Sequence, residues 1–253
     1  SSDDLTELSI PGTVEIDNTS YVVDKIAPSV VFSNKGKITS LTVGEGIKEI
    51  GANAFKGSSN LASVSLPTTL TTIGDYAFNG TKLTELHIDS VKSIGVGAFQ
   101  SCTDLQKIWL PASLKSIGSK AFDGCKLTRV TTETTLEINK DVFSQYGAFL
   151  FVPAGTSVKD KAGWGEFARV YEGYYMGETT PNNDKTYICL KQKNNDRTAI
   201  LTASNTTDPI PNEITFDNAK YKVTIIGESA LSGKGLNLAD WTELPESIVK
   251  IER

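Results

Sequence analysis

Ile50-Gly51-Ala52-Asn53-Ala54-Phe55 is a short motif that returns three more times at nearly constant spacing. The later copies are Ile73–Phe78, Ile94–Phe99 and Ile117–Phe122. The phenylalanines of the four copies follow one another after 23, 21 and 23 residues. Phe32 lies 23 residues before this series and Phe143 lies 21 residues after it, in degraded copies. Such a period predicts a repeat architecture in which one small unit is stacked many times.

A second motif, Leu-x-x-apolar-x-apolar, lies between the phenylalanines at Leu61–Leu66, Leu83–Ile88 and Leu105–Leu110. Its last two apolar residues are two apart and therefore face the same side of a short strand. The Ile-Gly step then makes a turn, and Ala-Phe supplies one small and one large side chain for the interior. Stacked copies can bury these side chains, whereas a single copy cannot. The two motifs together predict a right-handed leucine-rich repeat solenoid, α/β leaning all-β in class.

This pattern resembles the BspA-type leucine-rich repeat, which is found in surface proteins of anaerobic gut and oral bacteria. Residues 32–130 carry the pattern best, because both motifs recur there in register. The resemblance implies an N-terminal β-hairpin cap, from Leu8–Val14 through Tyr21–Ile26, whose strands cover the first coil. It also implies a C-terminal cap that begins at Leu150–Thr156.

The C-terminal cap is predicted to be helical. Apolar residues at positions i, i+3, i+4 and i+7 would share one helix face, namely Trp164, Phe167, Ala168 and Tyr171. Ser157 with Asp160 could form a capping box at the start of this helix. Gly163 and Gly165 would weaken it.

Three parts are expected along the chain: a solenoid with both caps over residues 1–172, a linker at 173–185 and a second, small β-rich unit at 186–253. The linker is polar and rich in turn-forming residues. The abrupt start and end of the sequence indicate a mature fragment excised from a longer protein.

The second unit restarts the N-terminal pattern of the first. Ile210–Ile214 and Tyr221–Leu231 match residues 10–14 and 21–32 in order and spacing. Leu244–Ile251 begins a further coil, so this unit holds too few repeats for a solenoid of its own. We expect it to consist mostly of strands, either packed on the first unit or cut short.

Charge and hydropathy exclude two classes of partner. The formal net charge is −5, and lysines and arginines are scattered along the chain. Nucleic-acid binding needs a concentrated cationic face, so no nucleic-acid partner is expected. The longest apolar run, Ala148–Val152, is far shorter than the roughly 18 residues that a membrane helix requires, so no membrane insertion of this fragment is expected.

Candidates for catalysis or metal binding are few and dispersed. His87 is the single histidine and stands at an outward position between Leu86 and Ile88, so a catalytic triad or a multi-histidine metal site is hard to build. Gly44-Glu45-Gly46 and Gly95-Val96-Gly97 lack the strand–helix setting of a nucleotide loop. The sequence therefore predicts a protein that is not an enzyme and has no catalytic residues, no cofactor and no metal.

The three cysteines are predicted to be core residues. Cys102 and Cys125 occupy the same position in neighbouring coils, and Cys189 alternates with Tyr187 in a strand. An odd number of cysteines without a CxxC pair argues against a disulfide framework or a zinc site. A disulfide between the two adjacent coils is nevertheless geometrically conceivable, because their Cα atoms would lie about 5 Å apart.

The outward positions of the predicted strands form the candidate binding surface. Register places Ser40, Ser63, Glu85, Lys107 and Arg129 in one column, and Thr42, Ser65, His87, Trp109 and Thr131 in the next. Glu85, His87, Lys107, Trp109 and Arg129 differ from the Ser/Thr background of the earlier coils. Exposed aromatic and arginine side chains are typical of binding hot spots. The alternative is that Trp109 only covers its neighbours or meets the second unit.

The family resemblance implies a non-catalytic adhesion protein, secreted or anchored at the bacterial cell surface. Its expected partner is a surface or matrix protein of a host or of a neighbouring cell, bound by a monomer. Two other functions stay open. The chain could be a glycan-binding accessory protein in which Trp109, Tyr174 and Tyr175 stack on sugars, or a structural spacer that holds another domain away from the cell.

Overall fold

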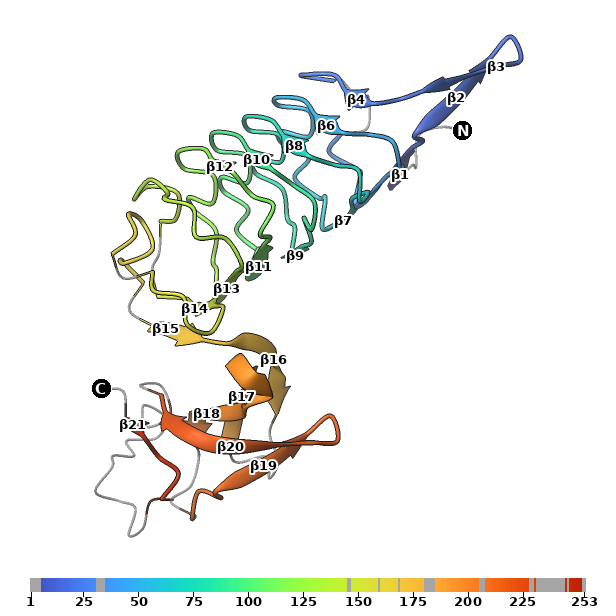
Figure 1. Cartoon of the computed structure of the whole chain (residues 1–253). Helices are drawn as coiled ribbons and strands as arrows, with labels where there is room; N and C mark the ends of the chain where they lie inside the picture. Colours follow the sequence, from blue (N-terminus) through green and yellow to red (C-terminus); the bar gives the residue numbers. More distant parts are fainter. Residues whose placement is uncertain are drawn as a thin grey trace. The chain divides into compact units, whose positions relative to one another are not determined.

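The repeat motifs form the coils of a β-solenoid in the computed structural model of the chain (Figure 1). The structure describes residues 6–30, 35–144, 147–158, 160–167, 169–179, 185–204, 208–227, 230, 244 and 246–251. The chain divides into two units. The first contains Ser1–Val152 and Thr156–Tyr171, and the second contains Pro153–Gly155 and Glu172–Arg253.

Two stacks of parallel strands run along the solenoid (Figure 1). The first stack consists of β4 (Lys25–Ile26), β6 (Glu49–Ile50), β8 (Thr72–Ile73), β10 (Ser93–Ile94) and β12 (Ser116–Ile117). The second stack is interrupted. One part consists of β1 (Glu7–Ile10), β5 (Ser40–Val43) and β7 (Ser63–Ser65), and the other of β9 (Glu85–Leu86), β11 (Lys107–Leu110), β13 (Arg129–Thr132), β14 (Phe149–Val152) and β15 (Arg169–Glu172).

The glycine of each Ile-Gly step is required by the close approach of the neighbouring coil. The Gly118 N–H donates to the Ile94 carbonyl at 2.8 Å, and the same bond recurs at the other three copies of the motif. A Cβ atom at Gly118 would lie 2.4 Å from the Val96 backbone nitrogen. The motif therefore selects glycine because two backbones touch there, in addition to the turn that the sequence predicts.

The phenylalanines of the motif stack into one continuous ladder in the core. Ring centroids of successive members, from Phe55 through Phe78, Phe99 and Phe122 to Phe143, lie 5.3–5.5 Å apart. The backbone alongside the rings is paired as well, since the N–H of Phe99 donates to the Ala121 carbonyl of the next coil. This ladder confirms that the repeats lie on top of one another.

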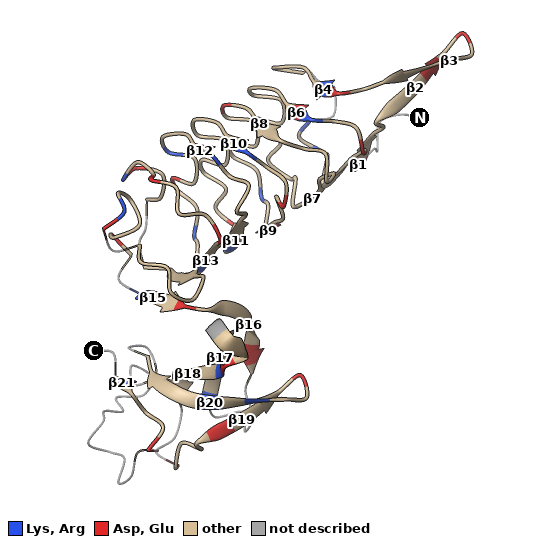
Figure 2. Cartoon of the chain, viewed as in Figure 1, with Lys and Arg blue, Asp and Glu red and all other residues tan. Residues whose placement is uncertain are grey.

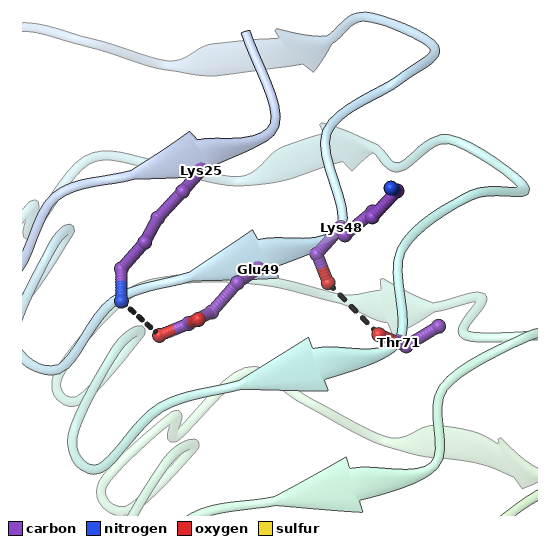
Figure 3. Close-up of polar contacts among 4 residues, drawn as sticks. All are labelled: Lys25, Lys48, Glu49 and Thr71. Atoms are coloured by element: carbon purple, nitrogen blue, oxygen red, sulfur yellow. Dashed lines mark hydrogen bonds and ion pairs between the residues drawn. The ribbon is translucent and has the colours of Figure 1, made fainter.

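Polar side chains also join successive coils. The Lys25 ammonium lies 2.7 Å from Glu49 Oε1, and the Thr71 hydroxyl donates to the Lys48 carbonyl at 3.2 Å. Figure 3 shows both contacts. Both contacts are exposed, so each contributes little beside the apolar core.

The prediction of a helical cap at the C-terminal end is wrong. Trp164 and Phe167 are buried and close the end of the ladder, with ring centroids 6.0 and 5.4 Å from that of Phe143. Their backbone forms turns, however, because Gly163 adopts a left-handed φ of +81° that a helix cannot contain.

The rest of the predicted helix face is also placed differently. Tyr171 lies in strand β15, and Ala168 lies outside the described residues. The capping box proposed for Ser157 and Asp160 has no described helix to cap.

The predicted N-terminal hairpin is present as β2 (Thr13–Ile16) and β3 (Thr19–Val22), paired antiparallel. The first coil is covered by the strands on either side of it, because β1 pairs with β5 and β4 pairs with β6. The hairpin itself projects away from the solenoid, and every residue of both strands is exposed (Figure 1).

The second unit is a mostly antiparallel sheet with a core of its own. Its strands are β16 (Tyr174–Thr179), β17 (Lys185–Lys191), β18 (Arg197–Ser204), β19 (Glu213–Phe216), β20 (Ala219–Ile226) and β21 (Lys250–Ile251). Part of the segment expected as a linker, residues 173–185, therefore contributes strand β16, which pairs with β17. Strand β21 pairs parallel with β20, as β6 does with β4 in the first unit.

Candidate functional site

The outward columns predicted from the sequence are present on β9, β11 and β13. Parallel pairing places Lys107 between Glu85 and Arg129, and places Trp109 beside Thr131. Inward residues alternate with them, since Ile108 and Leu110 are buried in the core. Four of the five candidate residues therefore lie on neighbouring strands of one sheet, and His87 directly follows β9.

Exposure differs along this surface. The side chains of Glu85 and His87 are 60% and 78% exposed, and Trp109 is 37% exposed. His87 Nε2 lies 3.9 Å from Glu85 Oε2, a pair that becomes ionic only when the imidazole is protonated. Arg129 is half-buried, and Thr131 is buried although it continues the column of Trp109. The accessible part of the surface is thus centred on β9 and β11.

An aromatic group continues both columns and was not foreseen from the sequence. Register places Phe149 beside Arg129, and Phe151 beside Thr131. The rings of Phe149 and Phe151 lie 5.7 and 5.5 Å from that of Tyr171. The signal was available in Phe149-Leu150-Phe151-Val152, where alternate residues point to opposite faces of a strand.

A small cavity opens where the second stack is interrupted, between β7 and β9. Its volume is about 210 Å³, and it is lined by Val64–Thr68 and Leu70 on one coil and by His87–Val91 on the next. The turn after the strand is also one residue shorter in the second of these coils. Leu66 and Leu70 are four residues apart, whereas Ile88 and Val91 are three apart.

His87 connects this cavity with the outward columns, because it lines the cavity and also faces Glu85. The cavity is smaller than the roughly 300–1,000 Å³ of typical small-molecule sites.

The cysteines are buried and free, as the core prediction requires. The Cys102 and Cys125 thiols donate to the carbonyls of Phe78 and Phe99, each at 3.2 Å. The hydrogen bond with Cys102 and burial raise the pKa of Cys125, and burial raises the pKa of Cys189 to about 12. Thiols with a raised pKa, as at Cys125 and Cys189, are poor nucleophiles. The hydrogen bond with Cys125 instead lowers the pKa of the buried Cys102 thiol.

Charged groups are interleaved along the coils, as Figure 2 shows. Within the described part of the chain, no three His, Cys, Asp or Glu side chains lie close enough to hold a metal ion. Among the same residues there is no helix long and apolar enough to cross a membrane.

Comparison with known proteins gives one family match. Residues 25–148 match the profile of the BspA type leucine rich repeat region, in six copies. None of the curated proteins compared with the chain matches it significantly.

Several solved structures are similar to the chain. A leucine rich repeat protein of T. pallidum is 29% identical, with a TM-score of 0.45 over 50% of this chain and 58% of its own. A leucine rich cell surface protein from Faecalibacterium prausnitzii is 20% identical, with a TM-score of 0.39 over 98% of this chain and 66% of its own. The pneumococcal vaccine antigen PcpA is 16% identical, with a TM-score of 0.41 over 99% and 84%. The chain thus spans less than two thirds of the first two structures.

Proposed function

Because residues 25–148 of this chain belong to the BspA type leucine-rich repeat family, we propose that it is a non-catalytic interaction protein of the bacterial cell surface. In this proposal the protein is secreted or anchored outside the cell. It adheres to surface or matrix proteins of a host or of neighbouring cells through its repeat solenoid.

The observation that carries the proposal is the exposed indole of Trp109 on a parallel sheet. Its neighbours on the same strand, Ile108 and Leu110, are buried on the inner side of that sheet. Tryptophan and arginine are the residues most enriched at energetic centres of protein interfaces. Stacked coils hold the outward side chains in place before binding, which lowers the entropic cost of association. Glu85 and Lys107 on adjacent strands add charges of both signs around the indole.

The test measures binding of the immobilised full chain to a panel of purified extracellular-matrix proteins. For each partner found, Trp109→Ala is expected to weaken the affinity tenfold or more, as loss of roughly 1.4 kcal/mol or more at a hot spot would do. Thr42→Ala is the matched control, because Thr42 is exposed in the same outward column on β5. Equal affinities of the two variants would remove the patch from the proposal.

Localisation is tested separately on intact cells of the source bacterium. Protease added outside the cells should cleave the protein while a cytosolic marker stays whole. Protection of the chain until the cells are lysed would contradict a surface location.

Glycan binding is a second candidate, favoured by the exposed aromatic faces of Trp109 and Tyr174. Aromatic rings of this kind can stack on sugars. A glycan array run beside the protein panel separates the two functions, because hits on glycans alone favour the accessory role. No binding in either assay would favour the third function, a structural spacer that holds another domain away from the cell.

A further inference from the structure

The chain contains two copies of one β-hairpin, offset by 200 positions. Ile10–Ile26 aligns with Ile210–Ile226 without a gap, and the turn residues Asp17-Asn18 recur as Asp217-Asn218. All four turn residues adopt left-handed φ angles between 47° and 58°. The strand register is also the same, since Thr13 pairs with Val22 as Glu213 pairs with Lys222.

The environments of the two hairpins differ. Tyr21 is 51% exposed, whereas its counterpart Tyr221 is 1% exposed. Val14 is 37% exposed, and its counterpart Ile214 is 5% exposed. Equivalent apolar side chains therefore face solvent in the first unit and form the core of the second.

The second hairpin is buried by the β-meander β16–β18. Strand β18 pairs parallel with β20, with Thr198 opposite Lys222 and Leu201 opposite Ile226. Phe216 packs against β16, because a Cβ atom at Gly177 would lie 2.4 Å from its ring. Sheet order places β18 on one edge of β20 and β19 on the other.

In the first unit the edge that corresponds to β18 has no strand on it among the described residues. The opposite edge is occupied, because β2 pairs with β3, and β6 pairs with β4. Ile16, on the same hairpin face as Val14 and Tyr21, adds apolar surface beside the open edge and is 56% exposed. An open strand edge with an apolar face is a template for strand addition.

We propose that the outer edge of residues 22–27, with the hairpin face of Val14, Ile16 and Tyr21, is a docking site for a three-stranded β-meander of a partner polypeptide. The partner's last strand pairs parallel with the edge, in the register that β18 adopts on β20. Its inward side chains are apolar, as Ala199 and Leu201 of β18 are.

The meander of the chain itself supplies the probe. Residues 174–204 are fused directly before Leu5, in place of residues 1–4, because Ser204 then precedes Ile10 by the same six positions that separate it from Ile210. The rest of the chain is kept whole. Hydrogen exchange is followed at the backbone amides of residues 22–27. Among them is Ala27, whose counterpart Gly227 donates to the Leu201 carbonyl at 2.8 Å.

We expect these amides to exchange about tenfold more slowly, or slower still, in the fused chain than in the unmodified chain. Two variants of the fused chain check the docking mode. Ala199→Asp with Leu201→Asp, made only in the added copy, and Ile16→Asp in the hairpin should each abolish the protection. Because Ile16 is exposed, the second variant leaves the solenoid folded.

Three results would overturn the proposal. Unchanged exchange in the fused chain, including the case of an added meander that stays unfolded beside a folded solenoid, shows that the edge does not accept it. Protection of these amides that persists in both Asp variants shows that the added meander binds without the predicted strand register. A dimer of the unmodified chain in sedimentation, with residues 22–27 already protected, shows that a second copy is the occupant.

Discussion

The rings of Phe99 and Phe122 lie parallel, with centroids 5.3 Å apart and an interplanar angle of 2°. The two residues are one repeat apart, and both side chains are buried. Their separation slightly exceeds the roughly 4.8 Å between paired strands, so each ring fills the interior of its own coil. Contacts between equivalent residues of neighbouring coils therefore contribute to the stability of the solenoid.

Removing one ring of the ladder should remove its stacking contacts with the rings on both sides. Phe99→Ala is expected to lower the free energy of unfolding by about 3–5 kcal/mol, measured by urea denaturation followed by circular dichroism. Lys126→Ala, at an exposed position, should change it by no more than about 0.5 kcal/mol. A loss below about 1 kcal/mol for Phe99→Ala would mean that the ladder is not tightly packed.

Two glycines should respond in opposite ways to alanine. At Gly118 the new Cβ would meet the Val96 nitrogen at 2.4 Å, so Gly118→Ala should destabilise the chain by about 1–3 kcal/mol. At Gly147 nothing lies within 4 Å, so Gly147→Ala should be neutral or stabilise by up to about 1 kcal/mol. Thermal denaturation of the pair compares them directly, and equal melting temperatures would speak against the close contact of the coils.

Glu45 should make stability depend on pH in the acidic range. The Thr68 N–H donates to Glu45 Oε1 at 2.9 Å and holds the pKa of this carboxyl below its ordinary value of 4.5. A lowered pKa in the folded state contributes stability that is present above pH 4.5 and is lost as the pH falls through the folded-state pKa. The stability difference between the native chain and Glu45→Gln should therefore shrink on acidification.

The pKa of Glu45 itself is measured by NMR titration of its side-chain carboxyl, and Glu45→Gln identifies the signal. A value at or above 4.5 would contradict the hydrogen bond from Thr68.

The three cysteines should not react with iodoacetamide at pH 8 in the folded chain, because their thiols are buried. All three should react once the chain is unfolded in urea, as counted by mass spectrometry. Val96→Cys is the positive control, because Val96 is 37% exposed. Two thiols missing from the unfolded count would indicate oxidation of Cys102 and Cys125 to the conceivable disulfide.

Much of the fold could be predicted from the sequence because a stacked repeat turns regular spacing into spatial contact. The phenylalanine ladder, the buried cysteines and the neighbourhood of Lys107 and Trp109 all follow from equal positions in successive coils. The C-terminal cap breaks the period, so that rule did not apply there. Trp164 and Phe167 have helical spacing, yet the left-handed Gly163 turns their backbone.

The cavity beside His87 was not predicted, although the sequence shows that the turn between Ile88 and Val91 is one residue shorter than the turn between Leu66 and Leu70. The spacing of the apolar residues shows which coil has the shorter turn. Whether the neighbouring turns close over this shorter turn depends on how their side chains pack, and residue spacing alone does not predict that packing.

The sequence by itself determined which residues repeat and therefore which ones stack, because the interactions that form the coils join equivalent positions. Only the tertiary structure decided the environment of Tyr21 and Tyr221. The two tyrosines have matching local sequences and the same backbone, but one is exposed and the other is buried. The physical reason is that burial depends on a partner strand from elsewhere, and β18 supplies that partner to β20 alone among the described strands.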